Sequence, residues 1–225
     1  MRSSLVRSRP AWLMGLQALT LVGGWLALTQ AALGGNGNGN GNKDVLRVEE
    51  TWELVLLDPN DERASPQVTT LLSATGNTSG YYVNFELNQN TQPEYSAGGL
   101  QLQLWNGATN VSNNTSARHE LLSTPGETVR WTQAVEVDGS NLRFEILNGT
   151  STTWGAFGGT GQMRLQLQAG VSQLNDYRPD VSVQNSAIGF GANRVDSLKL
   201  KKVRYTSRSG QVTEDNTERT VWQHE

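Results

Sequence analysis

The sequence predicts an all-β fold, in which two antiparallel sheets pack as a sandwich with little helix. Two observations lead to this prediction. Apolar and polar residues alternate in many short segments, and no stretch repeats apolar residues with the 3.6-residue period of a capped helix. An extended segment with one apolar face must bury that face, and two sheets packed face to face achieve this.

The predicted strands follow Val45, and each places its apolar residues on one side. Trp52 and Trp131 lie on these apolar sides, so both are predicted to be core residues. Strand by strand, the apolar faces are formed by Leu46, Val48, Trp52, Leu54 and Leu56; Tyr81, Val83, Phe85 and Leu87; Leu100, Leu102 and Leu104; Val129, Trp131, Val135 and Val137; Leu142, Phe144 and Ile146; Met163, Leu165 and Leu167; and Leu198 and Leu200.

Three pairs of turn-forming residues separate the alternating segments: Asn106-Gly107, Asp138-Gly139 and Asn148-Gly149. Such pairs tolerate the positive φ that tight hairpin turns need. The second pair predicts a hairpin between Val129–Val137 and Leu142–Leu147. Trp154 follows in a loop-like stretch, where either an exposed contact or a plug over the end of the sandwich would fit.

Residues 1–31 have the pattern of a secretion signal. Three arginines precede the apolar stretch Trp12–Leu28, and small residues end it, which predicts cleavage after Ala31 or Ala32. The alternative is an uncleaved membrane anchor, because Ala11–Leu33 is long enough to span a bilayer. Both interpretations place the following residues outside the cytoplasm, as a secreted, periplasmic or cell-surface protein.

Two segments follow the signal. Glycine and asparagine alternate in residues 32–44, and such a sequence has no side chains that could order it, so it is predicted to be a flexible linker. Residues 45–225 then form the sandwich domain.

Charge and cysteine content exclude several classes of function. Of 18 basic residues, three arginines fall in the predicted signal, which leaves 15 against 21 acidic residues, a net charge of −6. A mildly acidic chain without a basic stripe is suited neither to nucleic acid nor, after signal cleavage, to a membrane surface. The one basic cluster, Lys199, Lys201, Lys202 and Arg204, fits the solvated face of a strand. The absence of cysteine excludes thiol nucleophiles and cysteine-type zinc sites, and it favours a bacterial source for an exported protein.

The C-terminal part carries a resemblance. The run Ile188–Val195, followed by Ser197–Leu200 and Val203–Tyr205, resembles the closing strands of the concanavalin A-like jelly-roll superfamily of lectins and glucanases, and the strand of Trp131 with its hairpin resembles the middle section. The resemblance implies a jelly-roll-like sandwich, and it implies that structural calcium is compatible with the fold. The chain after the signal also resembles an uncharacterised family of exported bacterial proteins, which implies no activity.

The sequence predicts no catalytic residues. Glucanases of that superfamily carry the strand motif E-x-D-x-x-E, and the nearest match is Glu136–Asn141. Its last acid is replaced by Asn141, and Gly139-Ser140 turns the chain, so two carboxylates cannot face one another as retaining hydrolysis requires. A plain hairpin explains these residues.

Metal ligands are sparse as well. Asp58–Glu62 offers oxygen ligands that calcium would accept, but the residues lack the spacing of a calcium loop and are themselves turn formers. His119 and His224 are the only histidines, and neither belongs to a ligand cluster. No cofactor is predicted.

The polar sides of three strands predict a binding face. They present Tyr82, Asn84 and Glu86; Gln101, Gln103 and Trp105; and Arg164, Gln166 and Gln168. Amides donate and accept hydrogen bonds, and an exposed aromatic ring offers an apolar surface to a sugar. If these strands share a sheet, the predicted ligand-binding residues are Tyr82, Asn84, Gln101, Gln103, Trp105 and Gln166. The alternative is a solvated face without a ligand.

We therefore expect an exported, non-catalytic binding module whose partner is a polysaccharide or another envelope component. The alternatives are an enzyme acting on glycans, which would need two neighbouring carboxylates in a cleft, and a structural component of the cell envelope. The sequence leaves the oligomeric state open.

Overall fold

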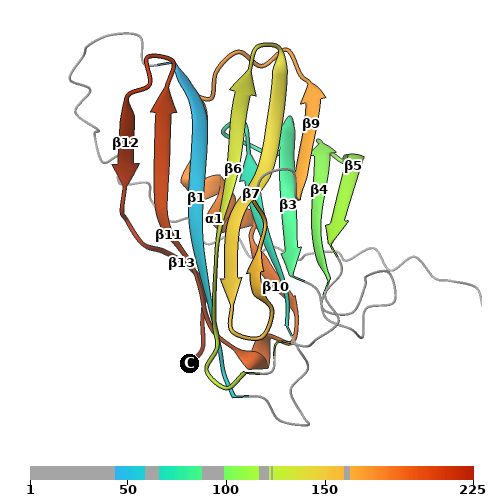
Figure 1. Ribbon diagram of the computed structural model, residues 1–225, viewed down its shortest axis with the longest axis vertical. Coiled ribbons are helices and arrows are strands. Elements are labelled where there is room, and N and C mark those ends of the chain that lie inside the picture. The colour runs from blue at the N-terminus through green and yellow to red at the C-terminus, as the bar shows by residue number, and fades with distance from the viewer. Residues whose placement is uncertain (1–43, 59–65, 88–98, 117–121, 123, 160–162) are drawn as a thin grey trace, which may run out of the picture. The chain divides into compact units, whose positions relative to one another are not determined.

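A computed structural model describes residues 44–58, 66–87, 99–116, 122, 124–159 and 163–225. In this part of the chain the backbone forms two antiparallel sheets (Figure 1). The buried apolar residues of the two sheets form one core cluster. The predicted two-sheet antiparallel sandwich with little helix is confirmed. The predicted signal, most of the linker, His119 and all but the first residue of Asp58–Glu62 lie outside the described residues.

The eight-stranded sheet has β1 near its centre, paired with β11 on one side and β6 on the other. Two short strands, β12 and β13, both pair with β11, and β8 and β9 both pair with β7. Its strands are β1 (Val45–Leu56), β6 (Thr128–Asp138), β7 (Asn141–Ser151), β8 (Gly155–Phe157), β9 (Arg164–Gln168), β11 (Val195–Ser207), β12 (Val212–Asp215) and β13 (Arg219–Gln223).

The five-stranded sheet runs in the order β10-β2-β3-β4-β5. Four of its strands, β2 to β5, follow one another in sequence as a meander, and β10 closes the edge beside β2. Its strands are β2 (Gln67–Ser73), β3 (Tyr81–Leu87), β4 (Leu100–Asn106), β5 (Thr109–Ser116) and β10 (Ala187–Phe190).

Helical structure is minor in the described ranges. A short helix, α1 (Pro179–Asn185), lies beside β2, and a single 3₁₀ turn covers Ala192–Arg194. Pro179 occupies the first turn of α1, where a missing backbone N–H costs nothing. Neither of these helices is long and apolar enough to cross a bilayer.

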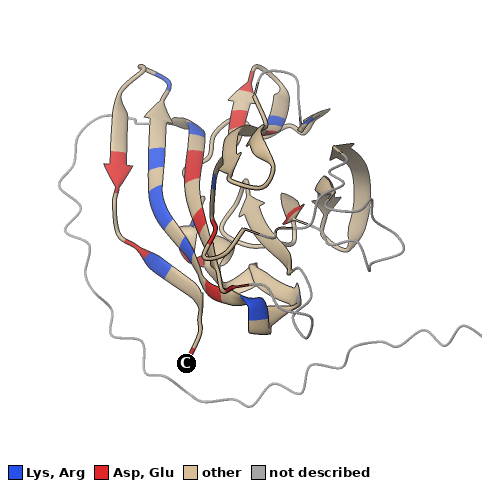
Figure 2. Cartoon of the chain, turned by 60° about the horizontal axis from the view of Figure 1, so that its bottom comes forward, with Lys and Arg blue, Asp and Glu red and all other residues tan. Residues whose placement is uncertain are grey.

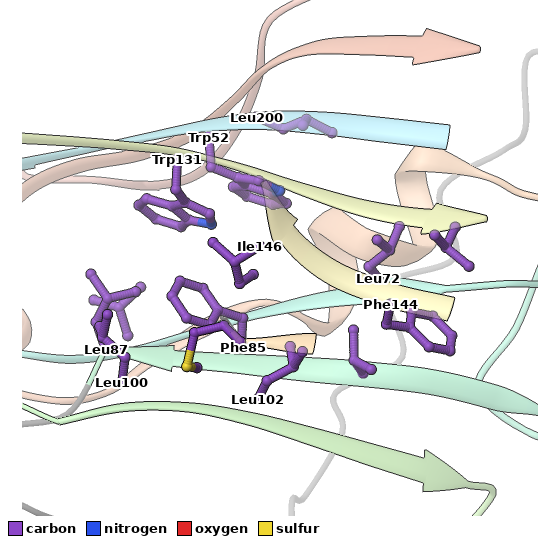
Figure 3. Packing of buried hydrophobic residues seen from close by; sticks show 14 of the residues in the cluster. Trp52, Leu72, Phe85, Leu87, Leu100, Leu102, Trp131, Phe144, Ile146 and Leu200 are labelled. Carbon is purple, nitrogen blue, oxygen red and sulfur yellow. The ribbon is translucent and has the colours of Figure 1, made fainter. Parts of the chain in front are cut away.

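The core lies between the two sheets. Figure 3 shows Trp52 and Trp131 from the eight-stranded sheet facing Phe85 from the five-stranded sheet. Trp52 is 0% and Trp131 1% exposed, so the prediction that both are core residues is confirmed. The same alternation buries Leu102, which opposes Phe85 on the neighbouring strand.

Two of the three predicted turns are confirmed and one is wrong. Asp138 and Asn141 close the hairpin of β6 and β7, and Gly139 has a φ of 62°. Gly107 has a φ of 56° in the turn between β4 and β5. Asn148-Gly149, in contrast, lies inside β7. The glycine is needed there for packing, since a Cβ at Gly149 would meet the ring of Phe157 at 2.0 Å.

Trp154 is buried and its ring meets that of Phe157 edge-on, so the interpretation of Trp154 as an exposed contact is wrong.

The chain contains strands that the sequence pattern does not reveal. β12 and β13 have no continuous apolar face and pair only along β11, at the edge of the eight-stranded sheet. The predicted strand at Met163 begins one residue later, because Met163 has a φ of 47° and stands outside the ladder, although its side chain is buried.

The basic cluster of β11 lies among acidic residues. Lys199 and Lys201 pair with Glu218, Lys202 with Glu214, and Arg204 with Glu49. Figure 2 shows the charged positions gathered on the strands of the eight-stranded sheet. The basic cluster is therefore neutralised locally, which agrees with its predicted place on a solvated strand face.

Candidate functional site

The outer face of the five-stranded sheet brings most of the predicted binding residues together. In the pairing of β3 with β4, Tyr82 lies opposite Trp105 and Asn84 lies opposite Gln103. Gln101 follows on the same side of β4, opposite Glu86. Because alternate residues of a strand point to the same side, these side chains share the face that is turned away from the core.

Two aromatic rings lie at one end of this face. The rings of Tyr82 and Trp105 are 7° from parallel, with centroids 6.5 Å apart. The Tyr82 hydroxyl donates a hydrogen bond to the carbonyl oxygen of Gly107 at 3.1 Å, and burial raises the pKa of this phenol. Trp105 donates its indole N–H to Gln103 Oε1 at 3.2 Å. Both rings are thereby fixed nearly parallel, and both remain partly exposed.

A chain of amide hydrogen bonds continues from the rings across the face. Gln103 Nε2 donates to Gln101 Oε1 at 2.7 Å and to Glu86 Oε2 at 3.4 Å. Asn113 on β5 lies opposite Gln103, and its Oδ1 accepts from Asn110 Nδ2 at 2.9 Å. We call this surface the amide platform and define it as Tyr82, Asn84, Gln101, Gln103, Trp105 and Asn113.

Charge is nearly absent from the five strands that carry the amide platform. Glu86 is the only charged residue in β2, β3, β4, β5 and β10, and it is 8% exposed. Figure 2 shows the contrast with the eight-stranded sheet. The platform therefore offers hydrogen-bonding groups and ring faces with almost no electrostatic field of its own.

Comparison with known proteins finds similarity only to solved structures, and that similarity is low. No protein-family model and no curated protein sequence matches the chain. Among solved structures, ligand-free congerin I is similar at 9% identity over 78% of this chain and 96% of that chain, with a TM-score of 0.33. Galectin-Ib of Xenopus laevis is similar at 12% identity over 59% of this chain and 92% of its own, with a TM-score of 0.27.

A peanut lectin with a 9mer peptide is similar at 12% identity over 76% of this chain and 68% of that chain, with a TM-score of 0.29. These are likenesses of fold, and at TM-scores of this size they assign the chain to no family.

Gln166 does not belong to the amide platform. It lies on β9, which pairs with β7 and is therefore part of the eight-stranded sheet (Figure 1). The expectation that the three polar strand sides share one sheet is wrong for this strand. Alternation shows which side of a strand is polar, but it does not show which sheet the strand joins. Arg164 and Gln168, on the same strand, lie outside the platform for the same reason.

A polar cleft adjoins the aromatic end of the amide platform. Its volume is about 460 Å³, and it is lined by the turn between β2 and β3 together with Asp176 and Arg178. The turn is fixed by the Asn77 side chain, whose Oδ1 accepts from the backbone N–H of Ser79 at 2.9 Å. Gly107 N donates to Gly80 O at 3.1 Å, so this turn contacts the turn beside Trp105.

Glu136, on β6 of the β6–β7 hairpin, is bound by two arginines. Glu136 accepts hydrogen bonds from Arg47 and from Arg143. Burial alone would raise the pKa of Glu136, but these two guanidinium groups lower it below its ordinary value. A carboxyl held as an anion cannot serve as a general acid. Among the described residues, no group of three or more His, Cys, Asp or Glu side chains is placed to hold a metal ion.

One buried polar cluster escaped the sequence prediction. Glu50 lies between the sheets and is 0% exposed, and its Oε2 accepts from Trp52 Nε1 at 2.9 Å and from Gln133 Nε2 at 2.8 Å. Its Oε1 accepts from the hydroxyls of Tyr177 and Ser182, each at 2.5 Å. Burial raises the pKa of the Glu50 carboxyl, although its four hydrogen bonds oppose that change.

The signal for this cluster is present in the sequence. Glu50 has the same parity as Val48 and Trp52, and Gln133 has the same parity as Trp131. Each is therefore a polar residue at a position that the alternation assigns to the buried face. The two residues lie directly opposite one another in the pairing of β1 with β6.

Proposed function

We propose that the protein is a non-catalytic binding module that holds a neutral polysaccharide on the amide platform. The observation that carries this proposal is the pair of parallel rings, Tyr82 and Trp105, fixed at the end of an uncharged row of amides. Rings on a sheet surface stack on the apolar faces of sugar rings, while amides satisfy the hydroxyl groups at their edges.

The charge distribution supports a neutral ligand. An anionic polymer would favour a surface with lysine or arginine, and none lies in the five strands of this sheet. A neutral polymer needs no ionic partner, and its hydroxyls can replace the water on Gln101 and Gln103 with hydrogen bonds of similar strength.

Binding without hydrolysis is supported by the carboxylates of the site. Retaining glycosidases need two carboxyl groups about 5 Å apart. On the strands of the five-stranded sheet, Glu86 is the one carboxylate, and Glu136 is bound by arginines on the other sheet. The proposed activity is therefore recognition alone.

The test is binding of the full chain to neutral polysaccharides, such as cellulose, xylan, mannan and chitin, followed by calorimetry on any that bind. We expect Trp105→Ala to weaken binding at least about tenfold, because the stacking of a sugar ring on the indole is lost. The matched control is Trp222→Ala, since Trp222 is 37% exposed and lies on β13 of the other sheet. Binding that Trp105→Ala leaves unchanged, or no binding to any polysaccharide, would contradict the proposal.

We also propose that the protein acts outside the cytoplasm. The support is the sequence of residues 1–31, with three arginines followed by the apolar stretch Trp12–Leu28. Cell fractionation with N-terminal sequencing of the exported chain tests this. A mature chain that begins at residue 32 or 33 is the expected result for a cleaved signal, and a full-length chain in the cytoplasmic fraction would contradict export.

A further inference from the structure

Three polar side chains meet in the interior where β2 of one sheet approaches β6 of the other. Thr70 and Glu50 are 0% exposed, and Gln133 is 1% exposed. The Thr70 hydroxyl donates to Gln133 Oε1 at 3.0 Å, and Gln133 Nε2 donates to Glu50 Oε2 at 2.8 Å. A nucleophilic hydroxyl, a carboxamide and a carboxyl group are thus aligned in a site shielded from solvent.

The orientation of the Gln133 amide is fixed by its neighbours. Its Nε2 faces two acceptors, Glu50 Oε2 and, at 3.3 Å, the carbonyl oxygen of Leu71. The opposite orientation would turn the amide oxygen toward both acceptors and would remove a hydrogen-bond donor from each of them. The carbonyl group of Gln133 is therefore directed toward the hydroxyl of Thr70.

We propose that Thr70 and Gln133 react to form an intramolecular ester that joins the five-stranded sheet to the eight-stranded sheet. In this reaction Thr70 Oγ1 forms a bond to Gln133 Cδ, and the bond from Cδ to Nε2 breaks. The carboxyl proton of Glu50 passes to the departing nitrogen, and the hydroxyl proton of Thr70 returns to Glu50. The leaving group is ammonia, and the reaction needs no oxidant, reductant or further reactant.

Glu50 is placed to protonate the leaving nitrogen. Its carboxyl group contacts the leaving nitrogen of Gln133, and Tyr177, Ser182 and Trp52 hold it in position. Burial raises the pKa of the Glu50 carboxyl while its four hydrogen bonds oppose that rise, and the protonated form is the one that can protonate a departing nitrogen. The dry interior also excludes the water that would hydrolyse the ester.

The cross-link would take the place that disulfides hold in other exported domains. The chain has no cysteine, so its two sheets have no disulfide between them. Thr70 and Gln133 are 63 residues apart in sequence, and an ester between them closes that length of chain into a loop. This inference is independent of the amide platform, which lies on the opposite side of the five-stranded sheet.

Intact mass spectrometry of the unfolded full chain tests the proposal. We expect a mass about 17 Da below that of the uncross-linked chain, because ammonia has left. Trypsin should then release residues 64–118 joined to residues 131–143, since these peptides contain Thr70 and Gln133. A chain without the 17 Da loss, whose two peptides separate after digestion, would overturn the proposal. Thr70 and Gln133 would then be joined by an ordinary hydrogen bond.

Variants assign the mass loss to this site. Asn-Gly sequences in residues 36–42 can also lose ammonia by cyclising, so Thr70→Val is the necessary control, and it should restore the full mass. Thr70→Ser keeps a hydroxyl and should retain the cross-link. Glu50→Gln keeps the shape of the side chain without a transferable proton, and it should give a folded, uncross-linked chain by circular dichroism and mass. A loss of ammonia that is as large in Thr70→Val as in the wild type would overturn the ester, and a cross-link that persists in Glu50→Gln would overturn the role of Glu50.

Discussion

The indole rings of Trp52 and Trp131 stack across β1 and β6, with centroids 6.4 Å apart and planes 9° from parallel. The two residues are direct partners in the strand register, and Phe85 of the other sheet packs against Trp131 at 5.9 Å between centroids. The indole N–H of Trp131 has no hydrogen-bond partner among the described residues. Ring packing therefore explains the place of Trp131 in the core.

Trp131→Ala should lower the free energy of unfolding by about 3–5 kcal/mol, because a large buried ring is lost and a cavity remains. Urea unfolding followed by circular dichroism measures this change. Val212→Ala is the control, since Val212 is 41% exposed and should change stability by less than about 0.5 kcal/mol. A cost below about 1 kcal/mol for Trp131→Ala would show that this ring does not anchor the core.

Gly149→Ala should destabilise the sandwich by about 1–3 kcal/mol, the usual cost of an overpacked core. A Cβ at this position would meet the Phe157 ring at 2.0 Å, so β8 must shift away from β7. Gly80→Ala is the matched control, because the nearest atom to its Cβ would be 3.6 Å away. Phe157→Leu should recover part of the lost stability when it is combined with Gly149→Ala. Equal stability of Gly149→Ala and Gly80→Ala would contradict this packing.

Asp215 should make stability depend on pH in the acid range. Burial alone would raise the pKa of Asp215, but hydrogen bonds from Thr217 and Arg219 lower it from 3.8 to about 2. Because the folded pKa is the lower one, the unfolded chain takes up the proton first as the pH falls. The stabilisation is complete above the unfolded pKa of 3.8 and is lost as the pH falls to about 2.

Asp215→Asn should therefore be less stable than the wild type at pH 7, and its stability should decline less between pH 4 and pH 2. Unfolding at a series of pH values measures the difference between the two chains, which removes the contribution of other acids. A carboxyl resonance of Asp215 that titrates at its ordinary value, as followed by NMR, would refute the prediction.

Gln103→Ala should weaken polysaccharide binding by about two- to tenfold, the effect of losing a neutral hydrogen bond worth about 0.5–1.5 kcal/mol. It also removes the acceptor that fixes Trp105. Gln166→Ala is the control of the same residue type, because Gln166 lies on the eight-stranded sheet. An equal loss of affinity in Gln103→Ala and Gln166→Ala would show that the polysaccharide does not bind specifically to the amide platform.

The alternation of apolar and polar residues predicts the fold class and much of the core. It places Trp52, Trp131 and Phe85 correctly, because burial decides the side on which each strand residue lies. It also predicts that Tyr82 and Gln103 point away from the core, as they do in the structure.

The assignment of strands to sheets could not be predicted in the same way. β9 has the polar pattern of a platform strand but pairs with β7, and nothing local to Gln166 specifies that partner. The interior polar cluster was missed for a different reason: Glu50 and Gln133 interrupt apolar faces, and their partners come from β2, α1 and the preceding loop. Contacts of such sequence separation depend on topology rather than on local pattern.

The uneven distribution of charge makes the molecule electrically two-sided. Ion pairs such as Lys202–Glu214 lie on the eight-stranded sheet, where dissolved ions screen them over about 8 Å at physiological ionic strength. The five-stranded sheet has little charge for those ions to screen. Adding salt should therefore act on one side of the sandwich and spare the other, so that ionic strength distinguishes a ligand seated on neutral amides from one attracted to lysines.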